Sequence, residues 1–576
     1  MILQALTSLY EALAQKGEIS KEGWSREKIS FALGIDENGD LLRITPLFET
    51  VDGPKGKTRE VPQKMTVPIK VGNTSPKFLW GNSGFILGTA NDKTPEAAKD
   101  CFKRNRDLHH EVLKGIEVPA AKAILSFFDR WEPEKTLENE LVTSCAGELL
   151  GKANMVFRFN GKFIHEIPQL AAAWQAHYGE TAKERGQCLV TGALDEIQKT
   201  HPTIKGVQGA QSSGAALVSF NASAFCSYNK EQNQNAPVGK YAAFAYTTAL
   251  NHLLADRKNV HRIGDAAVVC WAENADKQYE DFAAEVFFGD NVDKSDEQRL
   301  SALRTSLKLL ADGLPCKEMD LDPDRKFYIL GLSPNAARLA VRFFYCDSFG
   351  KIAGNIYKHH ERLEIVRPSY DKFPILPLWK LLSATVNPNA KDKTPNAAMA
   401  GAVARAVFSG GRYPASLLEC TFLRIKAERS ITRERAAIIK AYYLRNPNEK
   451  CPKEVLTVSL NENSKNIPYT LGRLFSVYEE IQQAANPGIN TTIKDRYFGS
   501  AAAMPATVFP ILSNLAQKHL RKLSDAQRVY LDKKVMTLKS VLGEQYPAHM
   551  SLPEQGSFDL GYYHQTQARY TKKEDK

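Results

Sequence analysis

Residues 53–58, with the sequence GPKGKT, contain glycines and a lysine of the kind that a phosphate-binding loop uses to hold a nucleotide. The pattern is incomplete, because Val51 stands where the first glycine of such a loop belongs and no clear strand precedes it. Pro54 also falls inside the loop. The sequence therefore predicts no ATP binding here, although Lys55, Lys57 and Arg59 could still contact phosphates.

Motifs for a nucleophile or a metal are also incomplete. The run from Gly209 to Gly214 contains two serines, but neither has glycine two residues away on both sides, as a hydrolase nucleophile elbow requires. Two adjacent histidine pairs, His109-His110 and His359-His360, would point in different directions on a helix, and no HExxH or CxxC accompanies them. We therefore predict a non-catalytic protein with no metal and no cofactor, whose nine cysteines are buried reduced thiols.

A glycine-rich polar stretch offers a different chemistry. Gly206, Gly209 and Gly214 allow close approach of the backbone to a partner. The residues among and after them supply hydrogen bonds without full charges: Gln208, Gln211, Ser212, Ser213 and Asn221. Such a loop suits contact with a nucleic-acid groove or with a protein backbone. The alternative is a polar turn that serves only the fold.

Positive charge is concentrated near the C-terminus. The net charge is +11, and residues 411–576 hold 25 Lys and Arg against 16 Asp and Glu, an excess of nine. The cations form two groups, Arg424, Lys426, Arg429, Arg433, Arg435 and Lys440, then Lys518, Arg521, Lys522, Arg528, Lys533, Lys534 and Lys539. Groups like these can line a groove that follows a nucleic-acid strand, although a solvated helix face is the commoner outcome for any single group.

Strand and helix patterns alternate in the part of the chain that would position the polar loop. Residues 155–165 alternate around Asn160-Gly161 and predict a hairpin with a tight turn. We predict a buried strand over 263–271, a strand pair over 327–332 and 339–345, and helices over 241–254, 297–310 and 349–363.

The last third of the sequence has only helical patterns. Helices are predicted over 397–408, 417–443, 470–485, 505–523 and 525–542, with Ser524 as an N-cap, Pro505 in a first turn and a frayed tail from Tyr570. The fold class is α+β, with a mixed body over 1–370 and an all-α bundle over 371–576. The sequence has neither a leader peptide nor an apolar run long enough to span a bilayer, so we predict a cytoplasmic protein.

Several ordered motifs resemble one family, the large subunit of the type I-C CRISPR interference complex, Cascade. They are the run HPTIKGVQGAQSSGAALVSFNASAFCSY from His201, QNAPVGKYAAFAYTTALNHLL from Gln234 and RIGDAAVVCWAE from Arg262. The opening MILQALTSLYEAL and residues 76–88 are similar to that family as well, except that Trp80-Gly81 replaces an expected Cys-Asp. The likeness covers essentially the whole chain and is weakest after about residue 450.

The resemblance implies a role in RNA-guided DNA recognition. Such a subunit lies at the 5′ handle of the guide RNA, recognises the protospacer-adjacent motif on duplex DNA, promotes R-loop formation and holds the displaced strand. Its C-terminal bundle resembles the small subunit of Cascade. Its partners are the backbone, RNA-processing and small subunits, and a recruited helicase-nuclease cleaves the DNA. Candidates for reading the motif are Lys70, Asn73, Lys77, Asn82, Gln208, Gln211, Ser212 and Ser213.

The basic helices would guide the displaced strand through Arg424, Lys426, Arg429, Arg433, Arg435, Lys518, Arg521, Lys522, Arg528, Lys533 and Lys534. Two alternatives stay open. One is a metal-dependent nuclease with dispersed ligands, and the other is a purely structural scaffold of the RNA–protein complex.

Overall fold

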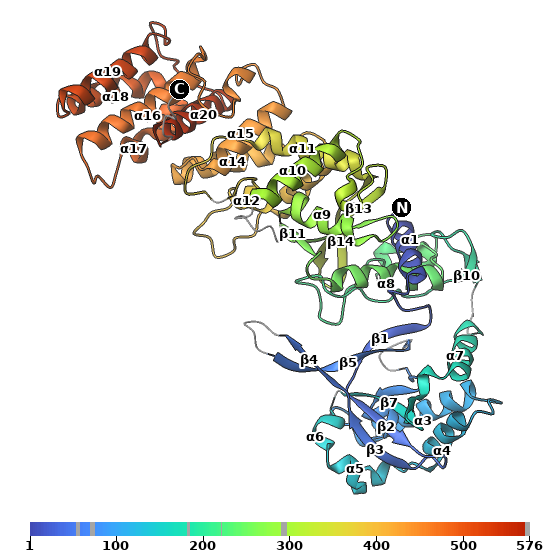
Figure 1. Ribbon diagram of the computed structural model, residues 1–576. Helices are drawn as coiled ribbons and strands as arrows, with labels where there is room; N and C mark the ends of the chain where they lie inside the picture. The colour runs from blue at the N-terminus through green and yellow to red at the C-terminus, as the bar shows by residue number, and fades with distance from the viewer. Residues whose placement is uncertain are drawn as a thin grey trace. The chain divides into compact units, whose positions relative to one another are not determined.

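The computed structural model in Figure 1 describes residues 1–52, 58–69, 75–151, 153–180, 185–220, 222–289, 297–371 and 373–570. The chain forms two compact units. The N-terminal unit comprises Leu6–Pro202 and Phe220–Ala249. The C-terminal unit comprises Met1–Ala5, Thr203–Ser219 and Leu250–Lys576.

A mixed five-stranded sheet is the centre of the N-terminal unit. Its order is β3-β2-β7-β6 with β8 paired to β7, and only β2 and β7 run parallel. Asn160 and Gly161 adopt φ values of 46° and 80° between β7 and β8, which confirms the predicted tight hairpin. The bounds are β2 (Phe31–Ile35), β3 (Leu41–Pro46), β6 (Trp80–Asn82), β7 (Asn154–Phe159) and β8 (Lys162–Phe163).

Helices enclose the core of this unit. Phe127 and Phe128 of α4 pack with Phe157 of β7, and Trp174 of α7 stacks on Phe78. The helices in this part of the chain are α1 (Ile2–Gln15), α2 (Ser83–Ile86), α3 (Pro95–Val112), α4 (Pro119–Arg130), α5 (Glu140–Thr143), α6 (Ala146–Leu149), α7 (Pro168–Glu180) and α8 (Lys240–Ala255). The last of these confirms the helix predicted over 241–254.

A second, three-stranded sheet has the order β1-β5-β4. Its strands are β1 (Trp24–Ile29), β4 (Phe48–Asp52) and β5 (Thr58–Pro68). Ile29, Met65 and Val67 are buried on one face of this sheet, where they pack with Trp80 and Val156. A short antiparallel pair, β9 (Arg185–Gln187) and β10 (Leu194–Glu196), follows α7 in the sequence.

An antiparallel sheet of four strands, in the order β11-β12-β13-β14, lies in the C-terminal unit (Figure 1, green to yellow-green). The strands are β11 (His261–Ile263), β12 (Ala266–Ala272), β13 (Lys326–Asn335) and β14 (Arg338–Ser348). The predicted pair over 327–332 and 339–345 is confirmed by the β13–β14 register. The buried strand predicted over 263–271 is confirmed as β12 from Ala266 onward, whereas Gly264, at φ 63°, turns the chain between β11 and β12.

Helices pack against this sheet and extend its core toward the C-terminus. They are α9 (Lys277–Ala283), α10 (Glu297–Ala311), α11 (Phe349–Leu363), α12 (Leu378–Ser383) and α13 (Ala397–Ser409). The predictions for α10, α11 and α13 are confirmed to within a residue or two. One hydrophobic core runs from Ile263 of β11 to Tyr563 near the C-terminus, so the sheet and the following helices share it.

The last helices correct two predictions. The single helix predicted over 417–443 is two helices, α14 (Ala415–Glu428) and α15 (Arg433–Arg445), because Arg429 takes a left-handed conformation at φ 51°. Ser524 does precede α19 (Asp525–Lys539), but its side chain makes no capping hydrogen bond. Pro505 opens α18 (Pro505–Leu520) as predicted. The remaining helices are α16 (Ile467–Ala485), α17 (Ile493–Ala503) and α20 (Leu552–Tyr570), of which α17 and α20 were not predicted.

Helices α16 and α20 touch backbone to backbone. A Cβ atom on Gly472 of α16 would lie 1.9 Å from the Phe558 carbonyl oxygen of α20. A Cβ atom on Gly561 of α20 would lie 2.1 Å from the Tyr469 carbonyl oxygen of α16. Real side chains never approach so closely, so both positions require glycine.

The fold class is α+β, a mixed body followed by a run of helices, as predicted. The division of the chain at 370/371 into two domains stays a prediction. Within the described ranges, no helix is long and apolar enough to cross a membrane.

Candidate nucleic-acid interface

The glycine-rich loop, residues 203–219, is folded back on itself in the C-terminal unit. Ile204 and Ala215 exchange two backbone hydrogen bonds of 2.8 and 2.9 Å that close its base. Two tight turns follow inside this closure. The first runs from Val207 to Ala210 and the second from Gln211 to Gly214, closed by backbone bonds of 3.2 and 2.9 Å.

Steric reasons favour all three glycines, of which Gly209 and Gly214 lie in these turns and Gly206 directly precedes them. Gly206, Gly209 and Gly214 have φ values of 93°, 85° and 103°, which other residues rarely adopt. A Cβ atom on Gly214 would also lie 2.7 Å from the Thr203 Cβ, and one on Gly209 would lie 3.2 Å from Pro334. The backbone of the loop therefore favours glycine at these three positions.

Neighbouring elements fix both ends of the loop. The Lys205 N–H donates to Asn251 Oδ1 at 2.8 Å, and Asn251 Nδ2 donates to the Thr203 carbonyl at 3.1 Å. At the other end, Ala216 bridges to β14 through bonds to Ala337 and Leu339, both of 2.9 Å. A loop attached at both ends holds its side chains in defined positions.

The predicted contact residues lie at the turns of this loop. Gln208 is a central residue of the first turn, and Ser212 and Ser213 are the central residues of the second, which begins at Gln211. All four side chains are exposed. Arg262 Nη1 donates to Gln208 Oε1 at 3.0 Å, so this amide offers its N–H groups and a cation lies beside it. Exposed amides and hydroxyls on a fixed backbone can form hydrogen bonds with base edges.

The early motif differs from this loop, because its predicted contact residues are largely covered. The Lys77 side chain is buried, with Nζ 4.7 Å from the Trp80 ring centroid and 5.2 Å from the Phe85 ring centroid. Asn82 is half-buried at the end of β6. Its Oδ1 is buried and has no hydrogen-bond partner among the described residues. Lys70 and Asn73 lie outside the described residues, as do Lys55, Lys57 and Asn221.

His109 supports the early motif from the core of the N-terminal unit. The Leu79 N–H donates to His109 Nε2 at 3.0 Å, and His109 Nδ1 lies 2.7 Å from the Asn105 carbonyl. Burial lowers the pKa of His109 to about 4, so the ring is neutral near pH 7. The adjacent His110 is exposed and pairs with Asp129 at 2.8 Å, so the two rings point apart as expected.

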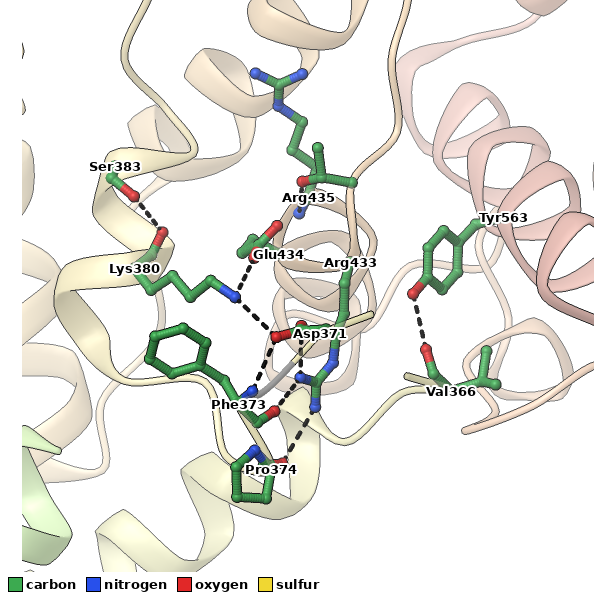
Figure 2. Close-up of polar contacts among 11 residues, drawn as sticks. Val366, Asp371, Phe373, Pro374, Lys380, Ser383, Arg433, Glu434, Arg435 and Tyr563 are labelled. Carbon is green, nitrogen blue, oxygen red and sulfur yellow. Dashed lines mark hydrogen bonds and ion pairs between the residues drawn. The ribbon is translucent and has the colours of Figure 1, made fainter. Parts of the chain in front are cut away.

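The first basic group divides between the surface and the core, and Figure 2 shows two of its arginines, Arg433 and Arg435. Lys426 and Arg429 are exposed, and Arg424 is half-buried 3.7 Å from Glu428. Arg433 and Arg435 of α15 are only 7% and 3% exposed. In this structure, the guanidinium groups of these two arginines are therefore occupied by internal partners.

Those internal partners are several. Arg433 reaches Asp371 at 2.9 Å and the Pro374 carbonyl at 3.2 Å, as Figure 2 shows. Arg435 donates to the carbonyls of Ala384 and Ser430 at 3.2 and 3.0 Å. Lys440 is buried too, with Nζ 3.0 Å from the Arg362 carbonyl, and burial lowers its pKa to about 8.

Asp371 is the acidic centre of this network. Lys380 Nζ lies 3.2 Å from Asp371 and 2.8 Å from Glu434. Burial raises the pKa of Asp371, but hydrogen bonds from the Phe373 N–H, Arg433 and Lys380 outweigh it, so the carboxyl titrates below its usual value. The network joins α12, α15 and the segment before α12, which is a structural role.

The second basic group is largely exposed. Lys518, Arg521 and Lys522 end α18 or follow it, and Arg528 and Lys533 lie on α19. Arg528 pairs with Asp525 at 2.8 Å, and the half-buried Lys534 lies 3.5 Å from Glu480 and 4.4 Å from the Tyr530 ring centroid. Over the described part of the chain, Lys518, Arg521, Lys522 and Lys533 have no ion pair within 4.0 Å. Their charges are available to a polyanion.

The reactive or metal-binding side chains of the protein do not gather in one place. All nine cysteines are free thiols; five are buried as predicted, whereas Cys346 is exposed. No cluster of three His, Cys, Asp or Glu side chains able to hold a metal occurs within the described ranges.

Two anchoring residues were not predicted. Asn251 lies in a helix that was predicted from its apolar stripe. Nothing in the sequence around Asn251 indicated that its side chain forms a hydrogen bond with a loop about 46 residues earlier. Arg262 begins a recognised motif, and a lone arginine there carries no indication of its partner Gln208.

Comparison with known proteins identifies the family. The family model described as CRISPR-associated protein (Cas_Csd1) matches residues 6–570. A search of curated proteins finds no match. Because the family model spans nearly the whole chain, this protein belongs to the Cas_Csd1 family of CRISPR-associated proteins.

Proposed function

We propose that this chain is the large subunit of a type I-C Cascade complex and that it binds nucleic acids without cleaving them. Membership of the Cas_Csd1 family supports the CRISPR assignment. The exposed polar loop and the exposed cations of α18 and α19 support two kinds of nucleic-acid contact. The guide RNA supplies complementarity to the target, so the protein has to recognise only a short motif and the strand backbones.

The two surfaces have different tasks in this proposal. The glycine-rich loop contacts base edges near the protospacer-adjacent motif and helps open the duplex. Lys518, Arg521, Lys522 and Lys533 hold phosphates of the displaced strand, with Lys426 and Arg429 as further contacts. We leave Arg433 and Arg435 out of this path, because both are buried with internal partners.

The partners follow from the same proposal. They are the 5′ handle of the guide RNA, duplex target DNA, the backbone, RNA-processing and small subunits, and a recruited helicase-nuclease. The protein acts in the cytoplasm, where both the DNA and the guide RNA are found.

The observation that carries the proposal is the exposure of uncharged hydrogen-bonding groups on a fixed backbone. Gln211, Ser212 and Ser213 project from a turn whose base is closed by backbone hydrogen bonds. A glutamine side chain can bond both N6 and N7 of adenine in the major groove, which discriminates among bases.

The test is a Gln211→Ala variant in a complex assembled with guide RNA. We expect its preference for the correct motif over a mismatched motif to fall by about 5- to 30-fold, which corresponds to about 1–2 kcal/mol for one good base contact. Binding to each of a panel of motifs, measured by gel shift at fixed salt, gives the preference. Gln298→Ala, an exposed glutamine on α10, is the matched control.

Two outcomes would contradict the proposal. An unchanged preference in variants of Gln208, Gln211, Ser212 and Ser213 together would favour a scaffold that never reads DNA. Cutting of labelled DNA by the isolated protein with Mg²⁺ or Mn²⁺, lost on changing one carboxylate, would favour a nuclease.

A further inference from the structure

The solvent face of the β1–β5 sheet in the N-terminal unit carries a row of cations. In the antiparallel register, Arg26 lies opposite Thr66 and Lys28 lies opposite Lys64. Residues directly opposite each other share a face, and all four of these side chains are exposed. The other face is the buried one described above, so the row points away from the core.

Lys28 and Lys64 are an unfavourable pair for the fold itself. Directly opposite residues of an antiparallel pair have Cβ atoms about 5 Å apart, and like charges there destabilise the sheet. Among the described residues, neither lysine nor Arg26 has an ion pair within 4.0 Å. The nearest carboxylate on the same face of β5 is Glu60, four residues and roughly 13 Å along the strand. A repulsion that the protein does not neutralise indicates an anionic partner.

The cationic row borders an open hollow with an aromatic wall. Trp24, Arg26, Lys64 and Thr66 line the hollow from the sheet, and Gln175 lines it from α7. The Trp24 Nε1 donates to Gln175 Oε1 at 3.3 Å, which fixes the indole ring at the wall.

The turn after α1 forms the rest of the hollow. It contributes Lys21 together with two carboxylates, Glu18 and Glu22. Burial raises the pKa of Glu22, and neighbouring Asp195 adds to this effect, while Lys240 opposes it. Both carboxylates come from this turn, whereas the residue directly opposite Lys28 in the strand register is Lys64.

We propose that this surface, Trp24, Arg26, Lys28, Lys64 and Thr66, binds a single-stranded stretch of nucleic acid. The row of cations neutralises successive phosphates, and an unpaired base lies against the Trp24 ring in the hollow. A duplex keeps its bases stacked inside and cannot offer one to Trp24, which is why an unpaired strand fits better. RNA and DNA strands share this chemistry, and the site requires neither the glycine-rich loop nor α18 and α19. Binding of a single strand at this surface does not depend on the proposed function. Only the identity of the strand that the surface binds in an assembled complex rests on that function.

The experiment uses the purified full chain with labelled 12-nucleotide RNA, 12-nucleotide DNA and a 12-base-pair duplex. Fluorescence anisotropy gives the Kd at several salt concentrations for the native protein and for a Lys28→Gln, Lys64→Gln double variant. We expect the double variant to bind one or both single strands about tenfold more weakly near 0.1 M salt. Its slope of log affinity against log salt should be shallower by about 1.4, which is the change for two lost phosphate contacts on a single strand.

Two controls separate this effect from a change in folding. Lys103→Gln with Lys114→Gln removes two exposed lysines of α3 and the turn after it, and should leave affinity and slope unchanged. The Lys28→Gln, Lys64→Gln variant should melt at a higher temperature than the native protein, because the cross-strand repulsion is gone. Weaker binding by a more stable protein cannot be a consequence of misfolding.

A spectroscopic measurement tests the role of the ring. Single-stranded nucleic acid should quench part of the tryptophan fluorescence when it binds. The Trp24→Phe variant should still bind the strand, but this quenching should be lost.

Several results would overturn the proposal. They are unchanged single-strand affinity and slope in the lysine double variant, quenching that persists in Trp24→Phe, or tighter binding to the duplex than to either strand through the same lysines. These results are independent of the Gln211→Ala test, so the present proposal and the proposed function can fail separately. If only RNA or only DNA loses affinity in the double variant, that strand is the ligand.

Discussion

Asp559 is a buried carboxyl on α20. It is only 2% exposed, and its Oδ1 has no hydrogen-bond partner among the described residues. Burial raises its pKa well above the usual value, and attraction by Lys426 opposes the shift only in part. The carboxyl is therefore neutral in the folded protein over a pH range in which it is ionised in the unfolded chain.

This shift has a definite sign for stability. Below the pKa of about 4 that the carboxyl has in the unfolded chain, the group is protonated in both states and does not lower the free energy of unfolding. As the pH rises from there toward the pKa in the folded protein, only the unfolded chain ionises, so the free energy of unfolding falls. We expect Asp559→Asn to leave stability nearly unchanged near pH 4 and to increase it at pH 8. The gain should be about 1.4 kcal/mol for each unit of the pKa shift.

Urea unfolding at several pH values measures the effect. A difference between Asp559→Asn and native protein that is the same at pH 4 and pH 8 would contradict the shift. Asp312→Asn, which removes an exposed carboxylate from the turn after α10, serves as the control for a change in surface charge.

At the scale of elements, the crossing of α16 and α20 depends on two glycines. Gly472→Ala would place a methyl group 1.9 Å from the Phe558 carbonyl oxygen, so the helices would have to separate. Overpacking of this kind usually costs about 1–3 kcal/mol. We expect a clear fall in the melting temperature, measured by circular dichroism.

Gly499 on α17 provides the matched control for this substitution. A Cβ atom there meets nothing within 4 Å, and the residue is exposed. Gly499→Ala should stabilise the protein by about 0.5–1 kcal/mol, because alanine is the better helix former. Equal effects of the two alanines would mean that α16 and α20 are farther apart than described.

The same crossing explains why α20 was not predicted from the sequence. Gly556 and Gly561 lower the helix propensity of residues 552–570, whereas packing requires at least Gly561. The break at Arg429 was hidden by the continuous helical pattern on both sides. A signal for it existed, since Thr432 precedes α15 and its side chain accepts from the Arg435 N–H at 3.4 Å.

For the candidate site too, the features encoded locally could be predicted from the sequence, and the features that depend on tertiary packing could not. Glycine spacing and polar composition indicated a polar loop, and tight turns are found there because such turns are encoded locally; that its residues read DNA stays a prediction. The burial of Arg433 and the opposition of Lys28 and Lys64 depend on tertiary packing and strand register, which a single sequence does not reveal. A cluster of cations in sequence is therefore a poor guide to which of them face solvent.

For the whole molecule, the two cationic surfaces should contribute independently to nucleic-acid binding. One is on the N-terminal unit at Lys28 and Lys64, and the other is on the C-terminal unit at Lys518 and Lys533. We expect Lys518→Gln with Lys533→Gln to reduce the salt slope for single-stranded DNA by about 1.4. Each lost phosphate contact lowers the slope by about 0.7, so all four substitutions together should reduce it by about 2.8 if one strand occupies both surfaces.

The matched control removes two exposed lysines from elsewhere in the C-terminal unit, Lys358→Gln with Lys453→Gln. A slope that the control lowers as much as the α18–α19 variant would show that net charge alone matters. It would then be wrong to assign the displaced strand to these helices.

The anchored glycine-rich loop has a consequence for the speed and thermodynamics of recognition. Hydrogen bonds from Asn251 and the bridge to β14 fix the loop before any ligand is present. A segment that is already ordered loses little conformational entropy when it docks, and no folding step has to precede contact. Encounter with DNA through this loop should therefore resemble rigid docking, with rapid sampling of wrong sequences and a small heat-capacity change.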